Sequence, residues 1–306
     1  MPDSPVPDFA AEQLSGQITA HTDEALFQQV GVRVAFTERG GGFSQGRFAS
    51  LNLKKGLGDD DRIVARNQSA LRAAFGCLRV PCIVPNQVHG TRVLDTASAS
   101  PVDVSAAWQW AQEGCDGVVV GCAGLAALLC YADCLPLVLV APTGDFAVVH
   151  CGWRGTVAGI ASKALGKLAA QGRCDASQVN AYIGPYIHEE CFEVGQEVAQ
   201  QFEEAFGVDT GVVRMAARVA DGTRATNDLA RTEGLGSIAD PSVLEAVDTL
   251  HVNLAKAVQA DLCNAGMVEE RIADVDICTV CTTDRFFSYR TEGGDTGRHG
   301  AFAVRL

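Results

Sequence analysis

The stretch ADCLPLVLVAPTGDFAVVHCGWRGT, residues 132–156, decides the fold. Leu135 to Val140 and Ala147 to His150 are runs of apolar residues bounded by Pro or Gly, a pattern typical of buried strands. A Gly-rich turn follows His150, and the Ala-, Lys- and Leu-rich segment after it predicts a helix over 156–171, ended by Gly172. Adjacent buried strands followed by a helix indicate a chain that combines sheet and helix.

Elements of both kinds are expected on either side of this stretch. Apolar spacing and turn residues predict helices over 22–30, 63–75, 194–206 and from 253 on, and strands over 32–36, 82–85, 118–120, 180–183, 286–289 and 301–306. Residues 211–249 carry the weakest pattern. With no internal repeat and no linker in view, we expect a loosely ordered lead-in over residues 1–30 and one α+β domain over residues 31–306.

Charge and composition limit the classes of function. The 306 residues are 47% hydrophobic and 20% charged, which is typical of a globular protein, and the net charge is −13. Such a surface repels phosphate backbones at long range, so we expect neither nucleic-acid nor anionic-membrane partners. A small anionic substrate remains compatible, because a local group of Arg residues can outweigh a distant net charge.

The cellular compartment is indicated by two features that the sequence does not show, a signal peptide and a membrane span. Residues 1–22 contain no basic segment followed by an apolar one, so no signal peptide is predicted. The least charged stretch, 117–132, is interrupted by Gly and ended by Asp133, which argues against a membrane span. Twelve cysteines without a secretion signal indicate reduced thiols. We therefore expect a cytoplasmic protein.

Three ligand-capable residues, His89, Cys134 and His150, lie at the ends of predicted strands or in the turns beside them. Two His and one Cys suit Zn²⁺ and leave a fourth position for water or substrate. Thiolate and imidazole also suit copper, so the residue types do not fix the metal. The alternative is a turn histidine, a buried thiol and a hydrogen-bonded core histidine, since cysteine is among the most buried residue types.

Anion binding is suggested by the segment from His150 to Thr156, where Arg154 lies beside a Gly-rich turn and a helix start. Free backbone N–H groups with a guanidinium favour phosphate, although a surface Arg beside a helix fits equally well. Trp153 suits stacking on a base or simple packing. Arg39, followed by Gly40 to Gly42, forms a weaker candidate of the same type.

The sequence resembles the YfiH-like family of purine nucleoside phosphorylases, whose members are also labelled laccase-domain proteins or polyphenol oxidases. The resemblance covers roughly residues 32–306. It is carried by these segments in order: 36–41 (FTERGG) with Ser44, 49–53 (ASLNL), 87–90 (QVHG), 115–117 (CDG), 132–136 (ADCLP), 150–155 (HCGWRG), 183–185 (IGP), 191–194 (CFEV), 287–290 (FSYR) and 296–298 (TGR). Departures are a long stretch over 221–250 and His299-Gly300 after the last motif.

The resemblance implies that His89, Cys134 and His150 bind the metal and carry catalysis. It implies an enzyme that phosphorolyses adenosine, inosine and methylthioadenosine and deaminates adenosine, with purine nucleoside and phosphate as substrates. The implied fold is an α/β sandwich of mixed sheets flanked by helices, similar to the Cys-His domains of deamidating toxins. We expect zinc, with copper as the alternative. The oligomeric state is not predicted.

Roles for further residues follow less directly. We expect Arg39, Asn52 and Arg154 to bind substrate, with phosphate on Arg154 and Arg39. Asp133 or Glu193 is a candidate for moving protons. For three residues, a contact with ligand and a bracing role are equally compatible with the sequence: Asn52, Gln87 and Asp116.

Three other functions remain open. Copper-dependent phenol oxidation is disfavoured, because multicopper enzymes use many His ligands and this chain has six His. A metal-free hydrolase would use Cys134 as nucleophile and His150 as base. A factor acting in peptidoglycan precursor editing, without turnover of nucleosides, is the third.

Overall fold

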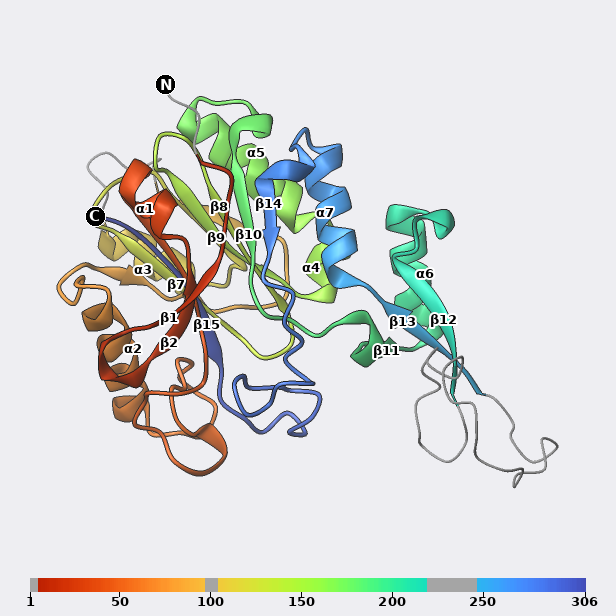
Figure 1. The fold of residues 1–306 in the computed structure, drawn as a ribbon, viewed down its shortest axis with the longest axis horizontal. Helices are drawn as coiled ribbons and strands as arrows, with labels where there is room; N and C mark the ends of the chain where they lie inside the picture. Colours follow the sequence, from red (N-terminus) through yellow and green to blue (C-terminus); the bar gives the residue numbers. More distant parts are fainter. Residues whose placement is uncertain (1–4, 97–103, 219–246) are drawn as a thin grey trace, which may run out of the picture. The chain divides into compact units, whose positions relative to one another are not determined.

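The computed structural model describes residues 5–96, 104–218 and 247–306. The chain divides into two compact units (Figure 1). The larger unit joins Met1–His188 to Leu254–Leu306, and the smaller unit is Glu189–Asn253. The single catalytic domain expected over residues 31–306 thus includes both units, and their action as one domain stays a prediction.

The first sheet of the larger unit brings together strands from the start, middle and end of the chain. Its order is β1 (Ala10–Gln13), β2 (Thr19–Thr22), β3 (Val32–Thr37), β15 (His299–Arg305), β7 (Ala126–Tyr131) and β4 (Cys82–Ile83). All neighbours are antiparallel except β4 and β7. Since β1 and β2 extend the sheet from β3, residues 10–22 differ from the expected loose lead-in. The helix expected there is present as α1 (Glu24–Val30).

The second sheet contains the two strands predicted from residues 135–140 and 147–150. Its order is β14 (Ile272–Asp274), β10 (Asn180–Ile183), β8 (Leu135–Val140), β9 (Phe146–Cys151), β6 (Gly117–Val120) and β5 (Val93–Asp95). The β10–β14 and β5–β6 pairs are parallel and the others antiparallel. This mixture of directions confirms the expected α+β class with mixed sheets. The expected likeness to the toxin domains stays a prediction.

The core lies between the two sheets. Alternate residues of β3, β7 and β15 form one buried cluster with residues of β6, β8 and β9, and Tyr131 and Phe146 are among its largest members. Each fully buried side chain of this kind contributes on the order of 1.5–3 kcal/mol. A second cluster joins the opposite face of the first sheet to α2 (Asp61–Ala74), with the Phe75 and Phe302 rings stacked 5.7 Å apart.

Helices cover the second sheet on its other side. Helix α5 (Ile160–Gly172) packs on β8 and β9, and α7 (Leu254–Asn264) packs against α5 (Figure 1). The remaining helices of this unit are α3 (Val104–Gln112) and α4 (Trp153–Val157). The helix expected over 156–171 is interrupted, because Gly159 adopts a left-handed φ of 71° that ends one helix and precedes the next.

The strand expected over 286–289 is wrong. Phe286 and Phe287 are buried in an irregular loop, and the backbone N–H of Ser288 donates to the Glu292 carboxylate at 3.0 Å instead of to a neighbouring strand. The aromatic run resembles a strand in sequence, but a local side chain has taken the place of the ladder partner.

The smaller unit is built on its own antiparallel sheet. It contains α6 (Gln196–Phe206) and the strands β11 (Glu193–Val194), β13 (Val247–Val252) and β12 (Val213–Arg218), which pair in that order. Most of the long stretch noted at 221–250 lies outside the described residues. Within the described ranges of both units, none of the helices is long and apolar enough to cross a membrane.

Short 3-10 turns complete the described chain. They lie at Ser15–Gln17, Gly46–Phe48, Ala176–Gln178, Glu189–Cys191, Val208–Thr210 and Glu269–Arg271.

Candidate metal centre

The expected cluster of His89, Cys134 and His150 forms where one sheet passes into the other. Cys134 lies in the connection between β7 of the first sheet and β8 of the second. His150 lies in β9 opposite Pro136, and His89 lies in the loop between β4 and β5. One ligand atom from each residue lies within 4.8 Å of the others. The three residues are therefore close enough to share one ion, and their role as ligands stays a prediction.

Unusual backbone conformations place two residues at this centre. His89 has φ 58° and Asp133 has φ 83°, both in the left-handed region that residues with a Cβ avoid. Such conformations cost on the order of 1–3 kcal/mol each and persist only where surrounding contacts hold them. The contacts around each residue are therefore part of how the centre is built.

The buried Asp116 carboxylate holds the His89 loop. Its oxygens accept the backbone N–H groups of Val88 at 3.2 Å, His89 at 2.9 Å and Gly90 at 2.7 Å. Three consecutive N–H groups converge on one side chain, which fixes the turn that carries His89. Asp116 itself is fully buried, and its contacts favour bracing over contact with a ligand.

The same carboxylate orients His150. Its Oδ1 lies 2.8 Å from Nδ1 of His150, and the backbone N–H of His150 donates to the carbonyl oxygen of Asp116 at 2.7 Å. With Nδ1 held in this way, Nε2 is the nitrogen that remains for Cys134 or a metal. From the sequence, bracing and contact with a ligand are equally compatible with Asp116. Its position just before β6, which pairs with β9, places its carboxylate beside His150 and favours bracing.

Charge within the cluster favours the thiolate. Burial raises the pKa of the Cys134 thiol, but the positive charge of His150 and hydrogen bonds from His150 and His89 outweigh burial, so the net shift is downward. Burial lowers the pKa of His150, yet the Cys134 thiolate and Asp116 together shift it above its usual value. The lowered pKa of Cys134 and the raised pKa of His150 are consistent with each other, since both favour a thiolate beside a cationic imidazole. A thiolate is also the form in which cysteine binds metals and attacks substrates.

Gly152 leaves room above the cluster. A Cβ at this position would lie 2.8 Å from Nδ1 of His89, 3.4 Å from Cε1 of His150 and 3.5 Å from Sγ of Cys134. The HCGWRG motif therefore supplies one histidine of the cluster and also a glycine whose missing side chain avoids a clash with the cluster.

Gln87 fastens the same loop to the first sheet. Its Nε2 donates to the carbonyl oxygen of Cys130 at 2.8 Å, and its Oε1 accepts the Cys130 backbone N–H at 3.0 Å. The side-chain amide thus pairs with β7 as a strand residue would. Of the two roles left open for Gln87, these contacts favour bracing.

Asp133 also braces the centre. Its Oδ1 accepts the Thr279 hydroxyl at 2.6 Å, its Oδ2 accepts the backbone N–H of Arg290 at 2.7 Å, and its carbonyl oxygen accepts Ile187 N–H at 2.9 Å. These contacts tie three loops to the residue before Cys134. They favour a structural role over the proton transfer considered for Asp133. The other candidate, Glu193, lies in the smaller unit.

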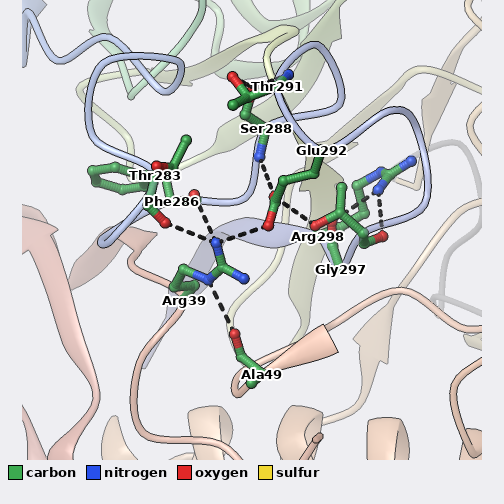
Figure 2. A network of polar contacts seen from close by, with 10 residues as sticks. Arg39, Ala49, Thr283, Phe286, Ser288, Thr291, Glu292, Gly297 and Arg298 are labelled. Carbon is green, nitrogen blue, oxygen red and sulfur yellow. Dashed lines mark hydrogen bonds and ion pairs between the residues drawn. The ribbon is translucent and has the colours of Figure 1, made fainter. Parts of the chain in front are cut away.

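Arg39 is at the centre of a bracing network (Figure 2). Its Nε donates to Ala49 O at 3.0 Å, and its Nη1 lies 2.7 Å from Thr283 O, 3.4 Å from Phe286 O and 3.2 Å from Glu292 Oε1. The guanidinium also stacks 4.3 Å over the Phe287 ring. Its contacts hold the 283–292 loop against the Gly-rich loop, and its expected phosphate contact stays a prediction.

The contacts of Asn52 favour bracing, and its expected substrate contact stays a prediction. Its side chain is fully buried, its Oδ1 accepts the backbone N–H groups of Lys54 and Arg298, and its Nδ2 donates to Asp59 at 2.9 Å and to Lys54 O at 3.3 Å. Every hydrogen-bonding group of the amide is occupied inside the protein. Asn52 therefore positions two loops.

Arg154 remains exposed in the short helix α4, and its guanidinium lies 4.2 Å over the Trp153 ring. This contact favours the packing role considered for Trp153, and its stacking on a base stays a prediction. The expected phosphate contact of Arg154 stays a prediction.

The fold is a sandwich of two mixed sheets, and a His, Cys, His cluster that could hold a metal ion lies where they connect. Residues 33–305 match the family described as "Multi-copper polyphenol oxidoreductase laccase", and the chain belongs to this family, which includes the YfiH- and YlmD-like proteins. The resemblance noted from the motifs is thereby confirmed.

Relatives and solved structures agree with this assignment. The chain is 34% identical to a purine nucleoside phosphorylase of Deinococcus radiodurans, over 86% of this chain and 85% of the relative. It is 31% identical to adenosine deaminase RL5 from an unknown prokaryotic organism, over 88% and 92%. The crystal structure of YlmD from Geobacillus stearothermophilus superposes with a TM-score of 0.72 at 28% identity, covering 90% and 93%.

Proposed function

We propose that this protein is a metal-dependent enzyme of purine nucleosides, which phosphorolyses adenosine, inosine and methylthioadenosine and deaminates adenosine. The observation that carries the proposal is the His89, Cys134 and His150 cluster, with ligand atoms within 4.8 Å and Gly152 leaving room above them. The names of the relatives support the substrate class, since they include purine nucleoside phosphorylases and an adenosine deaminase.

Zinc is the proposed metal, held by His89, Cys134 and His150. Two imidazoles and a thiolate fit it in chemistry, and three protein ligands leave one position open. When bound, zinc supplies Lewis acidity and acidifies a coordinated water. Copper remains the alternative metal, because the same donor set also suits it.

The chain's own residues contribute positioning and charge. Asp116 fixes the tautomer and direction of His150 and the turn of His89. Asp133 keeps the loops at 187, 279 and 290 in place around Cys134. Phosphate is the second substrate of phosphorolysis, and exposed Arg154 is a candidate to bind it. Twelve free cysteines support the reducing compartment expected from the sequence, and the cytoplasm stays a prediction.

A second candidate function is a metal-free thiol hydrolase. The observation that favours it is the arrangement of Cys134, His150 and Asp116. The pKa of the Cys134 thiol is lowered, and Nδ1 of the neighbouring His150 lies 2.8 Å from Oδ1 of Asp116. A nucleophile, a base and an orienting acid suffice for acyl transfer. Phenol oxidation and peptidoglycan precursor editing remain alternatives, with no contact among the described residues that favours either.

Metal content and turnover test the proposal together. The protein is purified without added metal, alongside His89→Ala, Cys134→Ala and His150→Ala, and is assayed on adenosine and inosine with and without phosphate. We expect about one zinc per chain, lost in every variant together with turnover. A folded, metal-free wild type that hydrolyses acyl substrates would overturn the zinc proposal in favour of the thiol mechanism.

A further inference from the structure

Two basic residues, Lys54 and Arg298, are anchored through their backbone N–H groups on the same buried side-chain amide. Oδ1 of Asn52 accepts the backbone N–H of Lys54 at 3.2 Å and that of Arg298 at 3.0 Å. The backbone N–H of Leu53 also donates to Arg298 O at 3.0 Å. Two segments distant in sequence are thereby joined so that two cationic residues lie side by side.

The pair lies beside the end of β7 that leads into the metal centre. His299, which follows Arg298, pairs with Tyr131 in the sheet register, three residues before Cys134. The charge of Arg298 interacts with Cys130, Cys134 and Asp133. The Arg298 guanidinium is thus close enough to the centre to interact electrostatically with the Cys134 thiol.

The Lys54 side chain extends toward the segment that carries His89. Its Nζ lies 3.5 Å from Pro85 O, in the segment that continues to Gln87 and His89. Gln87 is fastened to the backbone of Cys130. The charges of Lys54 and Arg298 both act on Cys130, near the end of β7 that leads to Cys134.

Both side chains retain donors that no described residue uses. Nη1 of Arg298 donates to Thr296 O at 2.7 Å and Gly297 O at 2.8 Å, which fixes the guanidinium, while Nε and Nη2 have no partner in the described ranges (Figure 2). The Arg298 group also lies 5.7 Å from the centre of the Tyr289 ring. Lys54 gives its ammonium only one acceptor among the described residues, at the 3.5 Å limit of a hydrogen bond.

This arrangement differs from that of the two Arg residues expected to bind phosphate. Arg39 shares its Nε and Nη1 among four acceptors. Arg154 is exposed and stacked on Trp153. A fixed, partly buried guanidinium with unused donors beside an ammonium is better suited to a doubly charged oxyanion, particularly in a chain of net charge −13.

We propose that Lys54 and Arg298 form the subsite that binds inorganic phosphate for phosphorolysis. The inference rests on the proposed function and adds the residues that hold its second substrate. Asn52 acts as the positioning residue that sets the distance between the two cations.

Binding of inorganic phosphate to the full-length protein tests the subsite without requiring turnover. Isothermal calorimetry is carried out on wild type, Lys54→Gln, Arg298→Gln, Arg298→Lys and Arg154→Gln. Lys55→Gln is the matched control, because Lys55 is the next residue and is exposed. Thermal unfolding of each variant shows that it is folded, and Arg298→Lys retains the charge if Arg298→Gln loosens the 296–298 turn.

We expect about tenfold or greater weakening of phosphate binding in Lys54→Gln and Arg298→Gln, partial rescue in Arg298→Lys, and wild-type affinity in Lys55→Gln. In phosphorolysis, the KM for phosphate should rise in the same two variants and stay at the wild-type value in Lys55→Gln. Equal affinity in all variants, a loss confined to Arg154→Gln, or no phosphate binding by wild type would overturn the subsite. Phosphate binding that depends on Lys54 and Arg298 without nucleoside turnover would refute the proposed function and leave the subsite standing.

Discussion

Oδ1 of Asp116 lies 2.8 Å from Nδ1 of His150 and also accepts the backbone N–H of His89 at 2.9 Å. A single buried carboxylate therefore positions two of the three cluster residues, although they come from different loops. This shared dependence makes the geometry of the centre sensitive to a residue that does not belong to the cluster.

Replacing Asp116 by Asn tests this dependence. The amide would present N–H groups toward the N–H groups of Val88 or Gly90 and would change the hydrogen bond that sets the His150 tautomer. Residues that hydrogen-bond to metal ligands typically contribute about 10–100-fold in metal affinity, so zinc affinity should fall by about that factor. Competition with a chromogenic chelator measures it. Asp145→Asn is the control, since Asp145 is also buried but contacts Arg305 instead. Equal affinities in both variants would contradict the bracing role.

Gly152→Ala should block the centre while leaving the fold intact. The added Cβ would lie 2.8 Å from Nδ1 of His89, a separation that carbon and nitrogen do not tolerate without a shift. We expect loss of metal and of turnover. Gly166→Ala is the matched control, because nothing lies within 4 Å of a Cβ there and Gly166 is inside helix α5. That control should gain about 0.5–1 kcal/mol in stability. A Gly152→Ala protein with a full complement of metal would show that the space is not needed.

Arg39→Met should lower stability more than it changes phosphate affinity. The substitution leaves four acceptors, among them Thr283 O and Glu292, without their donor. Unpaired acceptors of this kind cost about 1–3 kcal/mol each where they are buried, so the urea midpoint should fall clearly. Arg33→Met, which removes an ion pair with the exposed Glu24, is the control and should change the midpoint little. An unchanged midpoint with a raised KM for phosphate would instead favour the substrate role expected from the sequence.

Much of the fold was predictable because its central strands carry a strong pattern. The bounds of β8 agree with the predicted run, since a buried strand rich in Val and Leu has few alternatives. The bounds of β10 agree as well, and all four of its residues are buried. Strand β7 was missed: its sequence AALLCY has no Val or Ile and reads only as a stretch of low charge. Strands β1, at the sheet edge, and β2, beside it, differ from the expectation because their polar sequences AAEQ and TAHT have no apolar alternation to detect.

The three residues of the candidate site could be predicted from the sequence, but the residues that hold them in place could not. His89, Cys134 and His150 were found because such residue types at strand ends are unusual. The roles of Arg39 and Asn52 depend on partners 244 and 246 positions away in sequence, at Thr283 and Arg298. Sequence alone does not show whether a polar residue faces a ligand or is already hydrogen-bonded within the fold.

His299 provides a prediction about acid stability. Its side chain is 1% exposed, and neither ring nitrogen has a hydrogen-bond partner in the described part of the chain. Its neighbours are the rings of Phe286 at 5.4 Å and Tyr131 at 6.5 Å. Burial lowers the pKa of His299 to about 3, and the charges of Arg298 and Arg39 add to this effect. The imidazole is therefore neutral in the native protein at every pH at which the protein is expected to work.

The unfolded chain binds a proton at His299 near pH 6.5, whereas the folded chain does so only near pH 3. Between these values the unfolded state holds more protons, so this residue removes stability as the pH falls below 6.5. At pH 5 the cost is on the order of 2 kcal/mol. His299→Phe should abolish it. At pH 8, where His299 is neutral in both states, the difference in urea midpoint between variant and wild type reports packing alone. We expect that difference to shift in favour of the variant at pH 5. An identical difference at both pH values would mean that His299 is protonated, or paired, in the folded protein.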